Sequence, residues 1–289
     1  MKIQQHLKTR THFTACLLAG VLSIAAQIAS GQQPLLELRF NETSAAVVST
    51  GAEEVAGKIF DAGGEAKDLH SQDRGGSSGK VGDRAFDESS TVSGEAGPVV
   101  MLPWPPNTPP MAKAFTITGW LKRDVANDED RTLLRLVRGG GKRWHEFAFD
   151  LGYYGVGRLA LSVNENVNEN RVTSKAAGYG SIVGEWVFFA VVFDGPAGQV
   201  TFYRGNASSG VQVVSQHPIS EGETLIDRGG NIMIGNSAKQ GDRAFVGFLD
   251  NIRVYVPEGS SEGALGVEAL ERIMAADLAA SPGKVPAAP

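Results

Sequence analysis

The sequence predicts an all-β protein made of two packed antiparallel sheets. Glycine is abundant, with 36 residues in 289, and it recurs between short runs rich in Val, Ile, Phe and Tyr. This rhythm of short strands and turns is typical of a sandwich or a barrel. The chain shows about ten such runs, without strand–helix alternation and without a repeat of fixed period. Two facing antiparallel sheets are the architecture that these observations favour.

The expected strands follow one another along the chain. In residues 34–40 (PLLELRF) apolar and charged side chains alternate, as in a strand with one buried face. A long loop-rich section is expected over residues 41–98, with one short strand at residues 81–86. The further strands are expected at FTITGWLKR (115–123), RTLLRLVRG (131–139), HEFAFDLG (145–152), GRLALSVN (157–164), WVFFAVVFD (186–194), QVTFYRG (199–205), NIMIGNS (231–237) and FVGFLDNIRVYV (245–256).

Two of these strands carry additional information. The strand at residues 186–194 is apolar on both faces, which predicts a central position in a sheet, and GPAG (195–198) predicts a hairpin turn into the next strand. In the strand at residues 245–256, a period of two places Asp250 on one face with five apolar side chains, Val246, Phe248, Ile252, Val254 and Val256. A carboxylate in an apolar stripe is costly unless a partner compensates it, so Asp250 is a candidate site residue.

The N-terminal segment predicts a signal peptide over residues 1–31. Basic residues precede an apolar run at residues 13–29, and Ala29-Ser30-Gly31 predicts cleavage after Gly31. An uncleaved membrane anchor is the alternative, but the run is short for a span and contains Gln27. Cys16 is the only cysteine, so cleavage would leave an exported chain without disulfides. We expect the protein to be secreted or to reside in a periplasm or cell envelope.

The C-terminal segment predicts one short helix and a tail. Apolar residues recur at helical spacing in GVEALERIMAADL, whereas PGKVPAAP is expected to be disordered. The predicted organisation is therefore a signal peptide at 1–31, one domain at 32–275 and a disordered tail at 276–289.

Composition and motifs narrow the function classes. The net charge is −5 and Lys and Arg are spread along the chain, which argues against nucleic acid as a partner. After the signal, no apolar run is long enough to span a membrane. The three histidines beyond residue 31 lack zinc-like spacing, and the chain contains neither a G-x-S-x-G motif nor a phosphate loop.

Several of these segments, in this order, resemble a known family. FTITGWLK, WVFFAVVFDGPAGQVTFYRG, IMIGNS and FVGFLDNIRVY, followed by a short helix, resemble the laminin-G-like or pentraxin-like domains of the concanavalin A-like lectin/glucanase superfamily. LLELRFNE and VGDRAFDE resemble the two N-terminal segments of these domains. The resemblance covers residues 34–274 and implies a two-sheet antiparallel jelly-roll sandwich with a short C-terminal helix.

The resemblance also implies a structural calcium ion. In this family the aspartate of the closing strand often helps to hold calcium, together with oxygens that follow the N-terminal segments. The matching positions here are Asn41, Asp87 and Asp250. Carboxylate and amide oxygens are ligands that calcium accepts. The alternatives are that Asp250 accepts hydrogen bonds from backbone N–H groups of a loop, or that it is simply exposed.

Ligand-binding candidates come from two other stretches. The aromatic residues Trp144, Tyr153 and Tyr154, with Trp104, could form a sugar-stacking platform, or they could be ordinary packing residues. In SVNENVNENRV (162–172), Asn166 and Asn168 could contact a sugar or a second calcium ion, or the segment could be a polar hairpin tip.

One strand raises the question of catalysis. Glu146 and Asp150 share a strand face, and a pair of carboxylates is the arrangement that glycoside hydrolases use. Laminarinase-type enzymes of this fold carry an E-D--E strand, which this spacing does not reproduce. We therefore favour a non-catalytic module that binds carbohydrate or another extracellular surface, with a glycan or a cell-surface or matrix protein as partner. A polysaccharide-active hydrolase and an envelope structural or protein-interaction domain are the alternatives, because the fold does not fix the function.

Overall fold

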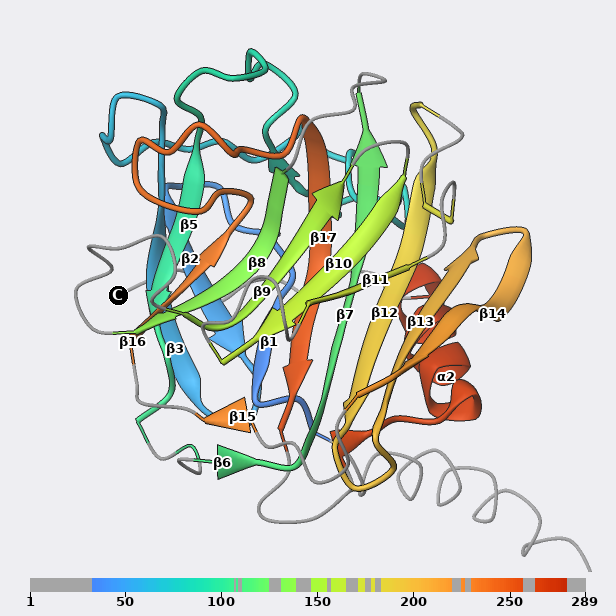
Figure 1. Ribbon diagram of the computed structural model, residues 1–289. Helices are drawn as coiled ribbons and strands as arrows, with labels where there is room; N and C mark the ends of the chain where they lie inside the picture. The colour runs from blue at the N-terminus through green and yellow to red at the C-terminus, as the bar shows by residue number, and fades with distance from the viewer. Residues whose placement is uncertain are drawn as a thin grey trace, which may run out of the picture. The chain divides into compact units, whose positions relative to one another are not determined.

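The computed structural model (Figure 1) describes residues 33–106, 108, 111–124, 131–138, 147–154, 157–164, 171–174, 178–179, 183–219, 225–226, 230–256 and 263–279. The expected signal peptide and residues 280–289 of the expected tail lie outside these residues. Among the helices of these ranges, none is long and apolar enough to cross a membrane.

The first sheet carries the predicted closing strand near its edge. Its strands run in the order β1 (Leu36–Leu38), β17 (Gly247–Tyr255), β7 (Ala114–Arg123), β12 (Trp186–Asp194), β13 (Gln199–Asn206) and β14 (Ser209–Pro218), and β4 (Phe86–Asp87) also pairs with β17. All of these pairings are antiparallel.

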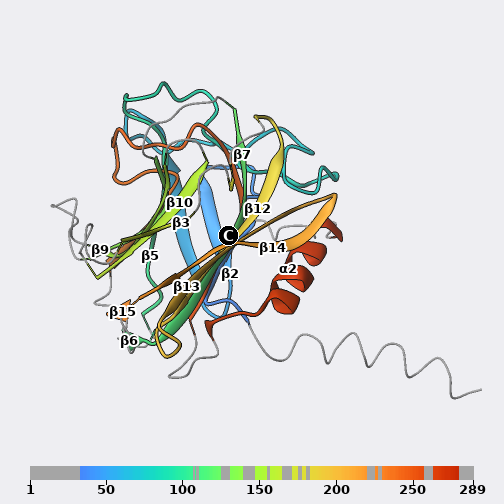
Figure 2. The ribbon, with the colours of Figure 1, turned by 45° about the vertical axis from the view of Figure 1, so that its right-hand side comes forward.

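The second sheet faces the first and is also antiparallel. Its strands run in the order β11 (Arg171–Thr173), β10 (Arg158–Val163), β9 (Phe147–Tyr154), β8 (Arg131–Arg138), β16 (Gly230–Ile234), β5 (Val99–Pro103), β3 (Glu54–Phe60) and β2 (Ala46–Thr50). A small separate pair joins β15 (Leu225–Ile226) to β6 (Met111–Ala112). Figures 1 and 2 show these strands as two layers, which confirms the predicted sandwich.

The main hydrophobic core lies between the two sheets. Phe115 on β7 stacks on Phe149 of β9 at 5.7 Å and on Phe193 of β12 at 5.0 Å, between ring centroids. β12 lies between β7 and β13, and its hairpin with β13 ends at Asp194 and Gln199, which confirms the predicted central strand and turn. Because inward side chains alternate with outward ones, each strand also presents an outer face.

The expectation of a loop-rich section over residues 41–98 was wrong in part. Its first half contains the hairpin of β2 and β3, which pair from Ala46↔Lys58 to Thr50↔Glu54. The strand expected at 81–86 is confined to Phe86 and Asp87. Small and charged residues dilute the apolar alternation of β2 and β3, so their strand signal is weak.

The predicted face of the last strand was also wrong. A register shift lies between Asp250 and Arg253, where three steps along β17 match two steps along β7. Asn251 has a positive φ of 49° at this point. Such a bulge moves the following side chains to the other face of the sheet. Phe248 and Asp250 therefore point outward, whereas Ile252 and Val254 belong to the core between the sheets.

The predicted C-terminal helix is present and packs on the first sheet. α2 (Val267–Ala279) extends past residue 275, the predicted end of the domain. Its residues Leu270 and Met274 pack with Trp120 and Phe188 from the outer faces of β7 and β12. Figure 2 shows the helix on the side of this sheet that faces away from the second sheet.

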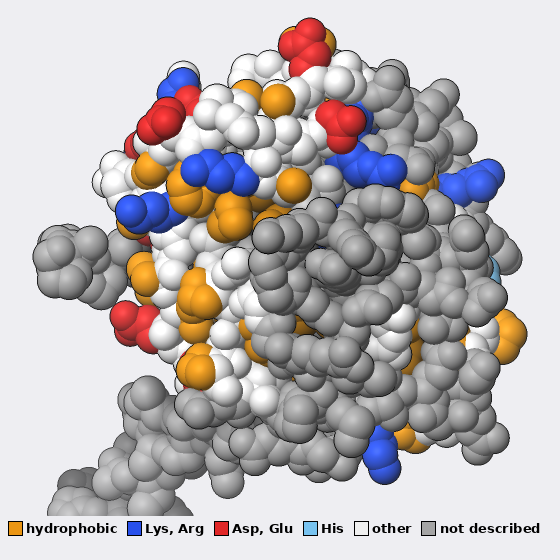
Figure 3. All heavy atoms as spheres, turned by 60° about the vertical axis from the view of Figure 1, so that its left-hand side comes forward, with side chains coloured by type: hydrophobic (Ala, Val, Ile, Leu, Met, Phe, Trp, Pro, Cys, Tyr) orange, Lys and Arg blue, Asp and Glu red, His pale blue; other side chains and the backbone are white. Residues whose placement is uncertain are grey.

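Charges of both signs are interspersed on the described surface drawn in Figure 3. Blue Lys and Arg side chains alternate with red Asp and Glu side chains there rather than gathering by sign. Charges mixed in this way largely cancel one another at a distance.

Candidate functional site

A row of four side chains crosses the outer face of the first sheet. Trp186 on β12 lies opposite Lys122 on β7, Lys122 lies opposite Phe248 on β17, and Phe248 lies opposite Asp87 on β4. Directly opposed residues in antiparallel strands project to the same face. All four are half-buried. We call this row the aromatic platform.

The two rings of the platform enclose the lysine. The Lys122 ammonium lies 4.2 Å from the ring centroid of Phe248 and 5.1 Å from that of Trp186. The two ring centroids are 6.4 Å apart, and the ring planes meet at 60°. Burial lowers the pKa of Lys122, and the carboxylates of Asp124 and Asp87 act in the opposite direction. The ammonium is therefore a partly dehydrated cation, held by ring faces and nearby carboxylates.

The sheet register creates this platform, so sequence patterns did not reveal it. Lys122, Trp186 and Phe248 come from three strands that are far apart in the sequence. Each residue is unremarkable in its own strand, as an outward polar or aromatic position. The platform becomes visible only when the strands are aligned, because cross-strand neighbours cannot be read from one strand. Its chemistry is that of a small binding surface with apolar ring faces, one donor and one acceptor.

The predicted calcium ligand Asp250 lies on the same outer face, fully buried beside the platform row. Its Oδ2 accepts hydrogen bonds from the Ser77 backbone N–H at 2.8 Å and the Asn251 side-chain amide at 3.1 Å. Its Oδ1 accepts one from the Asn251 backbone N–H at 2.7 Å. Burial raises the pKa of Asp250 well above its ordinary value, and Asp83 adds to this, while the Ser77 hydrogen bonds oppose it. These N–H donors are the partners that compensate the carboxylate among apolar neighbours.

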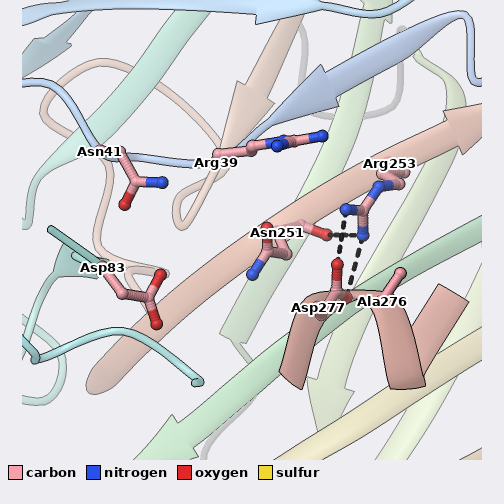
Figure 4. A pocket seen from close by; sticks show the side chains of 7 residues that line it. All are labelled: Arg39, Asn41, Asp83, Asn251, Arg253, Ala276 and Asp277. Carbon is pink, nitrogen blue, oxygen red and sulfur yellow. Dashed lines mark hydrogen bonds and ion pairs between the residues drawn. The ribbon is translucent and has the colours of Figure 1, made fainter. Parts of the chain in front are cut away.

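A polar cavity of about 160 Å³ adjoins Asp250 (Figure 4). Its wall is formed by residues of the loop after β1, the 76–84 segment, β17 and α2: Arg39, Asn41, Asp83, Asn251, Arg253, Ala276 and Asp277. Asp83 is satisfied by Ser78, whose N–H and hydroxyl both donate to Oδ2 at 2.7 Å. Burial raises the pKa of Asp83, with a smaller contribution from Asp277.

The structure does not bring the three predicted calcium ligands to one point of this cavity. Asn41 lines it, but its Oδ1 accepts a hydrogen bond from the Arg84 backbone N–H at 2.8 Å. Asp87 belongs to the aromatic platform, and its Oδ1 accepts from Ser89. Across the described ranges, no group of three or more His, Cys, Asp and Glu side chains could hold a metal ion.

In this arrangement the Asp250 oxygens face N–H donors, which suits a capped carboxylate rather than a cation ligand. Calcium at Asn41, Asp87 and Asp250 stays a prediction. Thermal melting in calcium and after full chelation tests it, because a bound ion must stabilise the fold. An unchanged melting temperature would leave the N–H donors as the only partners of Asp250.

The wall of the cavity contains a buried ionic network. The Arg253 guanidinium donates to Asp277 Oδ1 at 2.6 Å and Oδ2 at 3.0 Å, and its Nε donates to Glu37 Oε1 at 2.8 Å. Asp277 Oδ2 also accepts from the Trp120 indole N–H at 2.9 Å. Burial alone would lower the pKa of Arg253, but the Asp277 and Glu37 carboxylates raise it. This network fixes α2 to β17, β7 and β1.

The other predicted ligand residues have different environments. Tyr153 is only 1% exposed and packs against Phe245 in the core, so it does not offer a ring to solvent as predicted. Tyr154 is half-buried, and its ring lies over Gly152 of its own strand. Trp104 is buried and packs edge-on against Phe149. Trp144, Asn166 and Asn168 lie outside the described residues.

The strand with the proposed carboxylate pair holds an ion pair. Asp150 is 4% exposed and pairs with the Arg135 guanidinium of the neighbouring β8. Glu146 lies outside the described residues. Asp150 is thus engaged as the partner of the Arg135 cation.

Comparisons with solved structures support the fold. The binding domain of botulinum neurotoxin DC, solved in complex with SialylT, matches 85% of this chain and 51% of its own chain, with a TM-score of 0.54 and 11% identity. The botulinum neurotoxin serotype G binding domain matches 83% of this chain and 50% of its own, with a TM-score of 0.54 and 8% identity. The chain therefore spans about half the length of these toxin domains, and such low identity shows the fold alone.

Three further results complete the comparisons. A heptameric SAP-like pentraxin from Limulus polyphemus matches 65% of this chain and 80% of its own, at 15% identity and a TM-score of 0.46. No curated protein matches the chain. Residues 97–260, more than half of the chain, match a laminin-G-type family model described as the concanavalin A-like lectin/glucanases superfamily. The chain belongs to this superfamily.

Proposed function

We propose that the protein is a non-catalytic carbohydrate-binding module and that the aromatic platform is its sugar site. The observation that carries the proposal is the register that aligns Trp186, Lys122, Phe248 and Asp87 on one face. Aromatic rings offer apolar faces to sugar C–H groups with little conformational entropy to lose. The ammonium donates hydrogen bonds to sugar hydroxyls, and the carboxylate accepts them.

The charges around the platform favour a neutral sugar. Asp124 and Glu185 are exposed at the ends of the strands that carry Lys122 and Trp186, and Asp87 closes the row. Three carboxylates around one ammonium repel a uronic or sialic acid carboxylate. A neutral pyranose avoids this repulsion and can still stack on the rings.

Membership in a superfamily of lectins and glucanases supports a carbohydrate ligand, and the Asp150–Arg135 ion pair supports a non-catalytic role. The residue pattern of positions 1–31 supports export, so the proposal places the module outside the cytoplasm, secreted or in the envelope. Sequencing the N-terminus of the exported protein tests this placement, and the expected first residue is Gln32.

The sugar site is tested by affinity electrophoresis against a panel of neutral and acidic polysaccharides, followed by titration calorimetry. Trp186→Ala and Phe248→Ala are expected to weaken binding of the best glycan by about tenfold or more, by analogy with the about 1–3 kcal/mol that a nucleic-acid base contributes when it stacks on an aromatic side chain. Phe60→Ala is the matched control, because Phe60 is also half-buried under a lysine, with Lys239 4.3 Å from its ring centroid on the second sheet.

Each alternative has its own signature in this experiment. Release of soluble sugar from the panel would identify a hydrolase instead of a binding module. Equal binding by the Phe248→Ala and Phe60→Ala variants would move the sugar site away from the platform. A panel and glycan array without hits, together with a co-purifying protein partner, would support an envelope interaction domain.

A further inference from the structure

The imidazole of His70 lies between two carboxylates that come from different parts of the chain. Its side chain is fully buried. Asp68 Oδ1 accepts hydrogen bonds from the His70 backbone N–H at 3.2 Å and from the ring at Nδ1 at 2.8 Å. On the opposite side of the ring, Nε2 lies 3.6 Å from Glu42 Oε2, which is the separation of an ion pair. We call Glu42, Asp68 and His70 the histidine clamp.

The proton at Nε2 decides whether this arrangement is favourable. The Nδ1 proton is held by Asp68, because an ionised carboxylate only accepts hydrogen bonds. A neutral ring therefore presents the lone pair of Nε2 to Glu42 Oε2, and neither of these buried atoms has a hydrogen-bond partner among the described residues. A buried acceptor without a donor is costly, whereas a second ring proton turns the same contact into an attraction between a cation and a carboxylate.

Two carboxylates and a guanidinium set the charge around the ring. Burial alone would raise the pKa of Asp68, but the hydrogen bonds and the charge of His70, together with Arg84, lower it below its ordinary value of 3.8. Asp68 therefore stays ionised throughout the pH range in which histidine rings change their charge. The Arg84 guanidinium donates to the Ser71 carbonyl at 2.8 Å, and the two carboxylates outweigh its charge. The net charge around the ring is negative, which suits a cationic ring.

Backbone pairing connects the histidine clamp to the aromatic platform. His70 forms a β-bridge with Phe86 of β4, and the Asp87 backbone N–H donates to the Leu69 carbonyl at 2.8 Å. β4 in turn pairs with β17, where Asp87 lies opposite Phe248. The clamp therefore ties the loop after β1 to the strand that carries one end of the platform.

We propose that the histidine clamp is a pH-sensitive joint, closed when the ring is charged and open when the ring loses its proton. Stabilisation by a charged ring between carboxylates is present at low pH and is lost as the pH rises and the proton leaves. Histidine rings change their charge between pH 5 and 8. The consequence for glycans rests on the proposed function of the platform: binding is expected to be stronger at pH 6 than at pH 8.

Hydrogen exchange of the full chain, measured by mass spectrometry and expressed as protection factors, tests the clamp without any glycan. At pH 6, residues 39–45 and 66–71 of His70→Gln are expected to be protected about tenfold less than in the parent, because a charge-assisted pair is lost. This deficit should disappear at pH 8. His217→Gln is the matched control and should resemble the parent at both pH values, since His217 is half-buried on β14 and contacts Ser215.

Glu42→Gln gives a result that a contact independent of charge does not predict. Glu42 Oε1 accepts from the Val48 backbone N–H at 3.0 Å, and glutamine can keep this bond while its amide nitrogen donates to the neutral ring. Compared with the parent, this variant should be less protected at pH 6 and more protected at pH 8. Comparing chains at one pH also removes the pH response of Glu88, which is buried next to Asp87.

Titration calorimetry with the best glycan of the panel follows the same variants. Binding by the parent should weaken from pH 6 to pH 8, and Glu42→Gln should bind more tightly than the parent at pH 8. Absence of glycan binding at both pH values would count against the proposed function, and the exchange data would still decide the clamp. Equal protection of the parent and folded His70→Gln at pH 6 would overturn the clamp. A Glu42→Gln difference of the same sign at both pH values would also contradict it.

Discussion

Asn251 is the residue at which the last strand leaves its regular pleat. Its φ of 49° lies in the left-handed region, and its side-chain amide donates to Ser77 Oγ at 3.0 Å and to Asp250 Oδ2 at 3.1 Å. Asparagine tolerates this conformation better than most residues. One residue thus sets the bulge and also supplies two of the donors that stabilise Asp250.

Substitutions at Asn251 separate these two roles. Asn251→Ala is expected to lower the free energy of unfolding by about 2–3 kcal/mol, because it loses buried hydrogen bonds and strains the backbone. Asn251→Gly loses the same bonds but accepts the positive φ, so it should cost less. Urea denaturation measures both variants, and equal costs would show that backbone strain contributes little.

Glu88 is a second residue in an unusual local environment. It is fully buried, and neither carboxylate oxygen has a hydrogen-bond partner. Burial raises the pKa of Glu88 well above its ordinary value of 4.5, and Asp87 adds to the effect. A group whose pKa is raised on folding stabilises the fold below its unfolded pKa, and this contribution is lost as the pH rises through the folded pKa.

Glu88→Gln is therefore expected to be more stable than the parent at pH 8, by about 1–3 kcal/mol. The advantage should disappear below about pH 4.5, where the parent carboxyl is neutral in both states. Glu88→Met, which has no charged or amide group to bury, is expected to stabilise the protein at both pH values. Denaturation curves across this pH range would contradict the argument if Glu88→Gln were less stable at pH 8.

At the scale of elements, α2 depends on ionic as well as apolar contacts with the first sheet. Leu270 and Met274 bury apolar surface against Trp120 and Phe188, while Arg253 joins Asp277 to Glu37. Removing one partner of a buried ion pair is costly because the other charge is left behind. The helix should therefore respond to pH through this network.

Glu37→Gln tests this response. Burial raises the pKa of Glu37, but Arg253 and Arg39 outweigh it and lower the pKa below its ordinary value of 4.5. The stabilisation from Glu37 is present above that value and is lost as the pH falls through the folded pKa. Glu37→Gln is expected to cost about 1–3 kcal/mol at pH 7, and the difference from the parent should shrink below pH 4. If the difference in stability between Glu37→Gln and the parent did not change with pH, the loss would come from packing rather than from charge.

At the scale of the whole molecule, the two sheets supply the core without cysteine crosslinks among the described residues. β1 begins at Leu36, and Leu36, Leu38 and Phe40 all belong to the core between the sheets. A chain that begins at residue 32 therefore keeps every strand of both sheets. Its melting temperature is expected to match that of the protein exported and processed in cells, whereas a chain that begins at residue 42 should fail to fold. Calorimetric melting of the purified chains measures this.

The sequence by itself determined the fold class, the central strand, the 195–198 turn and the C-terminal helix. These features follow from local apolar periodicity and turn chemistry, which each segment carries in its own residues. The hairpin of β2 and β3 was not predicted, because its small and charged residues give little periodic signal. The prediction that Asp250 shares a strand face with Ile252 and Val254 was wrong, because one bulge at Asn251 reverses the alternation.

Only the tertiary structure decided the sites. The aromatic platform depends on the register of β12, β7, β17 and β4. The donors that stabilise Asp250 include Ser77, which is 173 residues away in the sequence. Local patterns encode which face of a strand is buried, but they do not encode which distant side chains become neighbours. Strand pairing and loop closure set those distances, and the chemistry of a site is a matter of distance.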